Sequence, residues 1–149
     1  MNERKFMDLA LREALKAGER GEVPVGAVIA DARGEVLAYA GNRNLELNDP
    51  TAHAEIVAIR AACAAMGSQR LEACDLHVTL EPCAMCAAAI SLARMRRVYY
   101  AAADEKMGAV DHGPRFFAQA CCHHRPEIYG GIGEEPACKL LKGFFAARR

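Results

Sequence analysis

The chain has 149 residues, of which 52% are hydrophobic, and its 19 basic and 19 acidic residues give a formal net charge of zero at pH 7. This length predicts a single domain, 1–149, that can bury a hydrophobic core without disulfides. The balance of charge excludes the strong overall basic field of many nucleic-acid-binding proteins, so any contact with RNA would need local basic patches.

The cysteine count and the hydropathy pattern bear on where the protein is found. Seven cysteines are present, and this odd number leaves a thiol unpaired in any disulfide scheme, which favours a reducing compartment. No apolar run approaches the roughly 18 uncharged residues expected of a membrane span. The N-terminal segment has the pattern of an amphipathic helix rather than of a signal peptide. We therefore expect a cytoplasmic protein with no membrane contact.

The spacing of apolar residues predicts secondary structure along the whole chain. A first helix ends near Gly18, and two apolar runs at 25–30 and 36–40, separated by a turn at 31–34, predict a β-hairpin. The other predicted elements are a helix at 51–66, a strand at 76–80, a helix at 83–93, a strand at 98–102, a short helix at 114–120, a short strand at 127–129 and a closing helix at 136–145. Strands that alternate with helices after a hairpin indicate a mixed sheet covered on both faces.

Two short motifs carry the chemistry of the chain. The first, T-A-H-A-E, contains His53 and Glu55, and the second, P-C-A-M-C, contains Cys83 and Cys86. One His and two Cys are three zinc ligands, and a zinc site with three protein ligands keeps a position for water, as catalytic sites do. Glu55 is a spare carboxylate that can transfer protons. The motifs predict a catalytic zinc site for hydrolytic deamination.

The spacing within the motifs predicts how they meet the metal. The two cysteines are i and i+3, so they share one face of a helix. His53 and Glu55 are i and i+2, which would separate them on a helix flank, unless both lie in a first helical turn that meets the metal end-on. Asp49 or Thr51 is a suitable N-cap for such a helix, and Pro82 suits a second helix start. We expect two helices to begin at the site.

The pattern H-x-E followed by P-C-x-x-C is similar to the known signature of the zinc-dependent nucleoside and nucleobase deaminases. Further segments resemble the bacterial tRNA adenosine deaminases, and together they span nearly the whole chain: 22–28, 41–43, 49–56, 78–86, 104–106 and 144–149. The resemblance implies a three-layer α/β/α cytidine-deaminase-like fold with a central mixed five-stranded sheet, one Zn²⁺ per chain and a homodimer. It also implies that the substrate is the wobble adenosine of an arginine tRNA anticodon stem-loop, which becomes inosine.

The same resemblance implies four substrate contacts. Asn42 and Pro24 would line the base pocket, Asp104 would contact a neighbouring ribose, and Phe145 would stack near the anticodon loop. The target base has to leave its stack before it can react, and the unpaired bases of an anticodon loop lower that cost.

Two other functions remain open at this point. A deaminase of a free base such as guanine or cytosine would carry the same H-A-E and P-C-x-x-C motifs, and the segment 107–124 matches the better-known tRNA deaminases less closely than the core does. A non-enzymatic, zinc-stabilised interaction module would instead need a fourth protein ligand and would have no use for Glu55.

Other charged and metal-binding residue types have a plain structural interpretation beside the functional one. Local basic clusters that could contact RNA, or could simply be solvated, are Arg94, Arg96 and Arg97; 123–125; and Lys139, Lys142, Arg148 and Arg149. Cys121, Cys122, His123 and His124 lack a matching second half at zinc-finger spacing, so we expect no metal there. Cys63, Cys74 and Cys138 are expected to pack as small core residues, and His77 and His112 to be structural.

Overall fold

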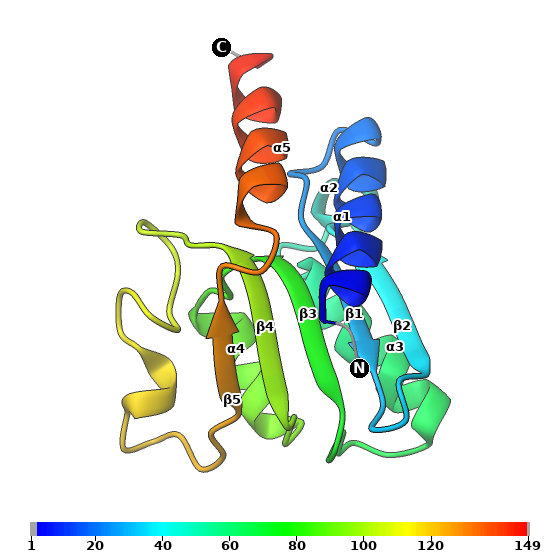
Figure 1. The fold of residues 1–149 in the computed structure, drawn as a ribbon, viewed down its shortest axis with the longest axis vertical. Helices are drawn as coiled ribbons and strands as arrows, with labels where there is room; N and C mark the ends of the chain where they lie inside the picture. The colour runs from blue at the N-terminus through cyan, green and yellow to red at the C-terminus, as the bar shows by residue number, and fades with distance from the viewer. Residues whose placement is uncertain (1–2, 149) are drawn as a thin grey trace.

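The computed structural model describes residues 3–148, and within them five strands form one mixed sheet in the order β2-β1-β3-β4-β5 (Figure 1). The strands are β1 (Gly26–Ala30), β2 (Val36–Gly41), β3 (Asp75–Leu80), β4 (Arg97–Ala102) and β5 (Glu127–Gly130). β1 pairs antiparallel with β2, as the predicted hairpin, and with β3. β3, β4 and β5 are parallel. The expected mixed five-stranded sheet is confirmed.

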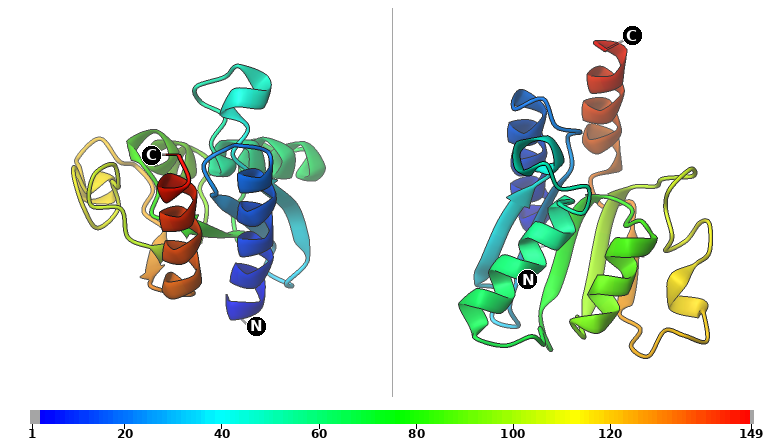
Figure 2. Two further views of the ribbon diagram at one scale, coloured as in Figure 1. Left: turned by 90° about the horizontal axis from the view of Figure 1, so that it is seen from above. Right: turned by 180° about the vertical axis from the view of Figure 1, so that it is seen from behind.

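Helices cover both faces of this sheet (Figure 2). The helices are α1 (Glu3–Glu19), the short α2 (Asn44–Leu47), α3 (Ala54–Met66), α4 (Ala84–Leu92), the 3₁₀ turn η1 (Phe116–Ala118) and α5 (Glu134–Ala146). On one face, α1 and α5 pack through Met7 and Ala137 against strand residues such as Val28. On the other, α3 and α4 pack through Ala58 and Ile90 against the opposite side of the strands. The three-layer α/β/α architecture is therefore confirmed.

The helix that carries the first motif begins later than predicted. The prediction placed its start at 51, with Asp49 or Thr51 as the N-cap, and this was wrong. The Asp49 carboxylate instead accepts hydrogen bonds from the Thr51 backbone N–H (2.8 Å) and hydroxyl (2.6 Å), so it closes a local turn. His53 is the N-cap, with extended backbone at φ −67° and ψ 154°, and α3 starts at Ala54. Asp and Thr side chains commonly compete with helix formation in this way.

Three smaller differences have local causes. The turn α2 was not predicted, and it is too short to have an apolar period. The predicted helix at 114–120 is only the three-residue η1. α5 starts at Glu134 rather than at 136, directly after Gly133, whose φ of 77° favours glycine. The predicted end of α3 at Gly67 is confirmed, because that residue is the left-handed C-cap. None of the described helices is long and apolar enough to cross a membrane.

Candidate metal centre and active site

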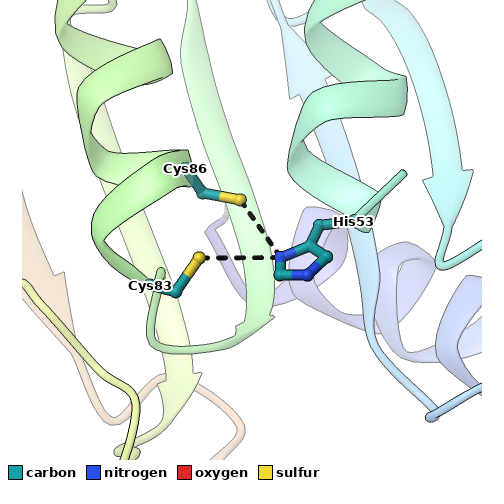
Figure 3. Close-up of side chains that lie close together, drawn as sticks. All are labelled: His53, Cys83 and Cys86. Atoms are coloured by element: carbon teal, nitrogen blue, oxygen red, sulfur yellow. Dashed lines mark hydrogen bonds between the residues drawn. The ribbon is translucent and has the colours of Figure 1, made fainter. Parts of the chain in front are cut away.

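The predicted metal ligands come together where two helices begin. His53 is the N-cap residue of α3, Cys83 is the N-cap residue of α4, and Cys86 lies in the first turn of α4 (Figure 3). Both N-cap residues have extended backbone, which turns their side chains across the helix ends rather than along a flank. The end-on arrangement expected from the motif spacing is present.

The distances between the ligand atoms fit a zinc ion. His53 Nδ1 lies 3.6 Å from Cys83 Sγ and 3.5 Å from Cys86 Sγ, and all three ligand atoms lie within 4.8 Å of one another. A tetrahedral zinc with Zn–N of about 2.0–2.1 Å and Zn–S of about 2.3 Å separates its nitrogen and sulfur ligands by about 3.6 Å. One imidazole with two thiolates is also a donor set that suits zinc. Within residues 3–148 the cluster has these three members.

The thiols of the cluster are electrostatically prepared for a cation. The hydrogen bond from Cys86 lowers the pKa of Cys83 to about 4, and burial opposes this effect. Cys86 keeps the shared proton, so its own pKa is raised. The hydrogen bond with Cys83 likewise raises the pKa of His53. A cation at this point would take the place of a proton, because metal ligands bind as thiolate and neutral imidazole.

Glu55 is a buried carboxylate that is not a member of the ligand cluster. It is the second residue of α3 and is 4% exposed. Burial raises its pKa to about 7, partly opposed by hydrogen bonding to the backbone and by the nearby His53. A carboxyl group that titrates near neutral pH can both accept and return a proton during catalysis.

A cavity of about 300 Å³ opens onto this cluster and onto Glu55. Its walls include apolar residues from the segment before β1 and from the end of β3, and polar residues from the start of α2 and from two loops: Val23, Val25, Leu80, Asn44, Asn42 and Asp104. A largely apolar cleft with a few convergent polar groups is the usual form of a small-molecule or base-binding site.

The structure separates the two residues expected to line the base pocket. Asn42 lines the cavity; its Oδ1 accepts the Ala54 N–H at 2.8 Å, and its Nδ2 donates to the Val23 carbonyl at 3.0 Å. It thereby holds the start of α3 beside the cavity. Pro24 is buried and lines a groove between α1 and α5, whereas its neighbours Val23 and Val25 line the cavity.

The two other expected substrate contacts border a larger groove of about 980 Å³. This groove shares Val23, Leu80, Asp104 and Met107 with the cavity, so the two adjoin. The Asp104 carboxylate accepts N–H groups of its own loop, and Phe145 on α5 is 48% exposed. Cationic side chains in the groove are Lys106 and Arg148.

Sequence reasoning missed two buried carboxylates at the site. Glu22 accepts the backbone N–H groups of Leu45 and Glu46, and so fixes the first turn of α2. Glu81 accepts N–H groups from the loop after β4, and burial, which raises its pKa, is outweighed by these hydrogen bonds, so that the pKa is lowered. For Glu81 the sequence did offer a signal. It is an acidic residue directly before Pro82 of the second motif, at the end of a strand predicted to be buried.

The basic clusters differ in where they lie. Arg96 forms two hydrogen bonds of 2.9 and 2.8 Å with the buried Asp75, and Arg97 lies 3.8 Å from Asp75 and 3.5 Å from Glu127. These residues are at the start of β3 and β4, at the opposite end from the site. Cationic side chains on or just after α5 are Lys139, Lys142 and Arg148, while Arg149 falls outside the described residues.

The remaining cysteines and histidines have structural roles. Cys122 is buried and donates to the His124 carbonyl, and the 121–124 segment joins no metal-binding cluster within the described residues. Cys74 is buried, and Cys63 and Cys138 pack against the two cores, as expected. His77 is buried between aromatic rings, and His112 hydrogen-bonds Glu81.

Comparisons with known proteins agree with this geometry. The profile of the family described as the cytidine and deoxycytidylate deaminase zinc-binding region matches residues 1–102. The tRNA-specific adenosine deaminase of Agrobacterium fabrum is 58% identical over 144 residues, covering 97% of this chain and 94% of its own length. That of Aquifex aeolicus is 43% identical over 149 residues, covering 100% and 97%.

Solved structures show the same similarity. One from a study of A-to-I editing by tRNA:A34 deaminases at the wobble position of transfer RNA has a TM-score of 0.90 and 59% identity, and the match covers 92% of this chain and 99% of that one. The guanine deaminase of Nitrosomonas europaea is 23% identical with a TM-score of 0.82, over 96% and 84% of the two chains, and so shares the fold.

Proposed function

Because this chain belongs to the tRNA-specific adenosine deaminases, within the zinc-binding cytidine and deoxycytidylate deaminase family, we propose that it converts the wobble adenosine of a tRNA anticodon to inosine and releases ammonia. The observation that carries the proposal is the three-ligand cluster of His53, Cys83 and Cys86 with the buried, non-ligand Glu55 beside it. A module stabilised by a structural zinc would close the site with a fourth ligand, and would not bury an extra carboxylate next to it.

The reaction needs a nucleophile and two proton transfers. His53, Cys83 and Cys86 would hold a zinc ion, and the ion would supply a reactive water, because zinc lowers the pKa of bound water from about 15.7 to about 7. Glu55 accepts a proton from the water and delivers it to purine N1 as the water oxygen bonds to C6. Glu55 then carries the second water proton to the exocyclic amino group, which leaves as ammonia when the C6–N bond breaks. A carboxyl group with a pKa of about 7 suits both directions of transfer.

The cavity residues would place the adenine for this chemistry. The apolar side chains of Val25 and Leu80 exclude bulk water from the base, and Asn42 offers a polar contact at the cavity wall. The expected contact with Pro24 is replaced in this proposal by its neighbours, because Pro24 holds their segment from the side of α1. Asp104 lies where the cavity meets the groove, and so would contact the sugar of a neighbouring nucleotide.

The size and lining of the groove favour an RNA loop over a free base. A free base needs only the cavity of about 300 Å³, whereas the adjoining groove offers about 980 Å³ more. Its lining offers Phe145 for stacking and Lys106 and Arg148 for phosphates, which are the residue types that hold single-stranded nucleic acid. The same lining also carries three carboxylates, so the two cations are single local contacts and not part of a basic field: Asp104, Glu105 and Glu134.

We further propose a homodimer in the cytoplasm. Helix α4 has no charged residue, and helices that are apolar all round are normally buried. Its uncovered stripe is Ala84, Met85, Ala88, Ala89 and Leu92, with Leu92 80% exposed. A second copy would cover this stripe. All seven cysteines are free, which fits a reducing compartment.

An inosine assay tests the function. Purified protein is given the anticodon stem-loop of an arginine tRNA, the same stem-loop with another sequence around the wobble adenosine, and free guanine, cytosine, adenosine and cytidine. We expect inosine at the wobble position of the arginine stem-loop and no ammonia from the small molecules. Glu55→Gln should keep its zinc and lose about 10²–10⁴-fold in turnover. Ammonia from a free base with an intact stem-loop would reassign the substrate.

A further inference from the structure

The buried carboxylate of Glu81 accepts five hydrogen bonds, and it does so from a single loop. Its Oε1 accepts the Asp104 backbone N–H (3.0 Å) and faces His112 Nδ1 at 2.8 Å. Its Oε2 accepts the backbone N–H groups of Val110 (3.1 Å), Asp111 (2.9 Å) and His112 (3.2 Å). The side chain is 0% exposed. One side chain of the β3 end thus holds both ends of the segment 104–112.

The same loop is docked on the turn that carries the metal ligands. The backbone N–H of Ala109 donates to the Pro82 carbonyl at 2.9 Å, and Gly108 forms an antiparallel bridge with Cys83. Gly108 lies so close to the carboxylate that a Cβ there would be 2.6 Å from Glu81 Cδ. The loop, the carboxylate and the metal-ligand turn therefore form one packed unit.

The other side of this loop faces the cavity and the groove. Asp104 and Met107 line both the cavity and the groove, and Lys106 lines the groove. Glu81 itself also borders the cavity. A carboxylate has about four lone-pair sites, and those of Glu81 are taken by the five donors, so it has no acceptor capacity left for a substrate or a water. Glu81 is also outside the ligand cluster.

We propose that Glu81 is a positioning residue, which holds the 104–112 loop against the metal-ligand turn in the form that binds the substrate, and that His112 completes this clasp. The loop supplies wall residues but neither a metal ligand nor the proton-transfer group. Loosening it therefore weakens substrate binding more than it slows the chemical step. The kinetic part of the inference rests on the proposed tRNA deaminase function.

The test uses the full-length zinc-loaded protein and Glu81→Gln, which keeps the shape but replaces one acceptor oxygen by an NH₂ group. We expect KM for the anticodon stem-loop to rise about tenfold or more, with kcat within about threefold and zinc content unchanged. Amide hydrogen exchange at Asp104, Val110 and Asp111 should accelerate about tenfold. Glu72→Gln is the matched control, because Glu72 is exposed in the loop before β3.

A second pair of variants keeps the test decisive if Glu81→Gln does not fold. His112→Asn retains an N–H donor near the Nδ1 position, so KM and the three exchange rates should stay near their wild-type values. His112→Ala removes this donor and should raise both KM and the exchange rates. Unchanged exchange and KM in Glu81→Gln or in His112→Ala would overturn the proposal. So would a fall in kcat alone, or loss of zinc with slow exchange retained. If wild type shows no tRNA activity, the exchange rates still decide the role of Glu81.

Discussion

His77 should make the stability of this protein depend on pH in a way that one substitution removes. The imidazole is 1% exposed and lies between Phe6 and Tyr99, with ring centroids 4.9 and 4.8 Å away. Neither ring nitrogen has a hydrogen-bond partner among residues 3–148. Burial lowers the pKa of His77 to about 4, although the carboxylates of Asp75 and Glu3 partly oppose it.

The sign and size of the effect follow from proton binding. The unfolded chain, with a His pKa of 6.5, binds a proton more readily than the folded chain does between pH 6.5 and about 4. The contribution to stability is therefore complete above the unfolded pKa, and is lost as the pH falls toward the folded pKa. At about 1.36 kcal/mol per pKa unit, the whole loss is about 3 kcal/mol, of which about 2 kcal/mol falls between about pH 7.5 and pH 5.

Denaturant unfolding of wild type and His77→Phe at both pH values measures this loss. The phenylalanine ring keeps the stack and has no nitrogen to leave unpaired, so we expect the variant to match wild type or exceed it at about pH 7.5. On acidification it should lose about 2 kcal/mol less than wild type. Acid also protonates the metal ligands, but it does so equally in both proteins. The difference between their losses of unfolding free energy therefore reports on His77 alone. Equal losses in the two proteins would refute the reasoning.

Three further substitutions test other parts of the structure. Cys86→Ala removes one of three ligands, so zinc measured by mass spectrometry should fall well below one ion per chain, and full occupancy would contradict the ligand set. Arg96→Ala removes two hydrogen bonds from the 3% exposed side chain of Asp75, which keeps only the longer ion pair with Arg97 at 3.8 Å. The change should cost about 1.5–3 kcal/mol in unfolding free energy. Unchanged kcat/KM for the stem-loop would agree with the place of Arg96 far from the site. Gly108→Ala would set a Cβ 2.3 Å from the Asp104 carbonyl oxygen and should lower Tm and activity, whereas Gly143→Ala, with nothing within 4 Å, should do neither.

The grouping of the three candidate ligands was predictable because it depends on few residues, which lie in two short motifs. The identity of the ligands and the i, i+3 spacing of the cysteines do not change with the rest of the fold. The start of α3 was not predictable from cap residues alone, because Asp49 has two partners within two residues of itself, and a local turn satisfied it first. The side of the chain on which Pro24 lies follows from strand geometry. Side chains of an extended segment alternate, so Val23 and Val25 share one face and Pro24 takes the other.

The shape of the site depends on contacts that no short motif contains. Glu81 meets loop donors 23 to 31 residues away, and Glu22 meets α2 at separations of 23 and 24. In each case a buried carboxylate accepts backbone N–H groups, which any residue except proline can offer, so the sequence of the loop carries no sign of its partner. The arginines at the start of β4 show the converse. Arg96 and Arg97 look like a basic patch in the sequence, and only the pairing of β3 with β4 brings Asp75 beside them. The candidate metal ligands are thus local in sequence, while the walls of the cavity are held by long-range hydrogen bonds.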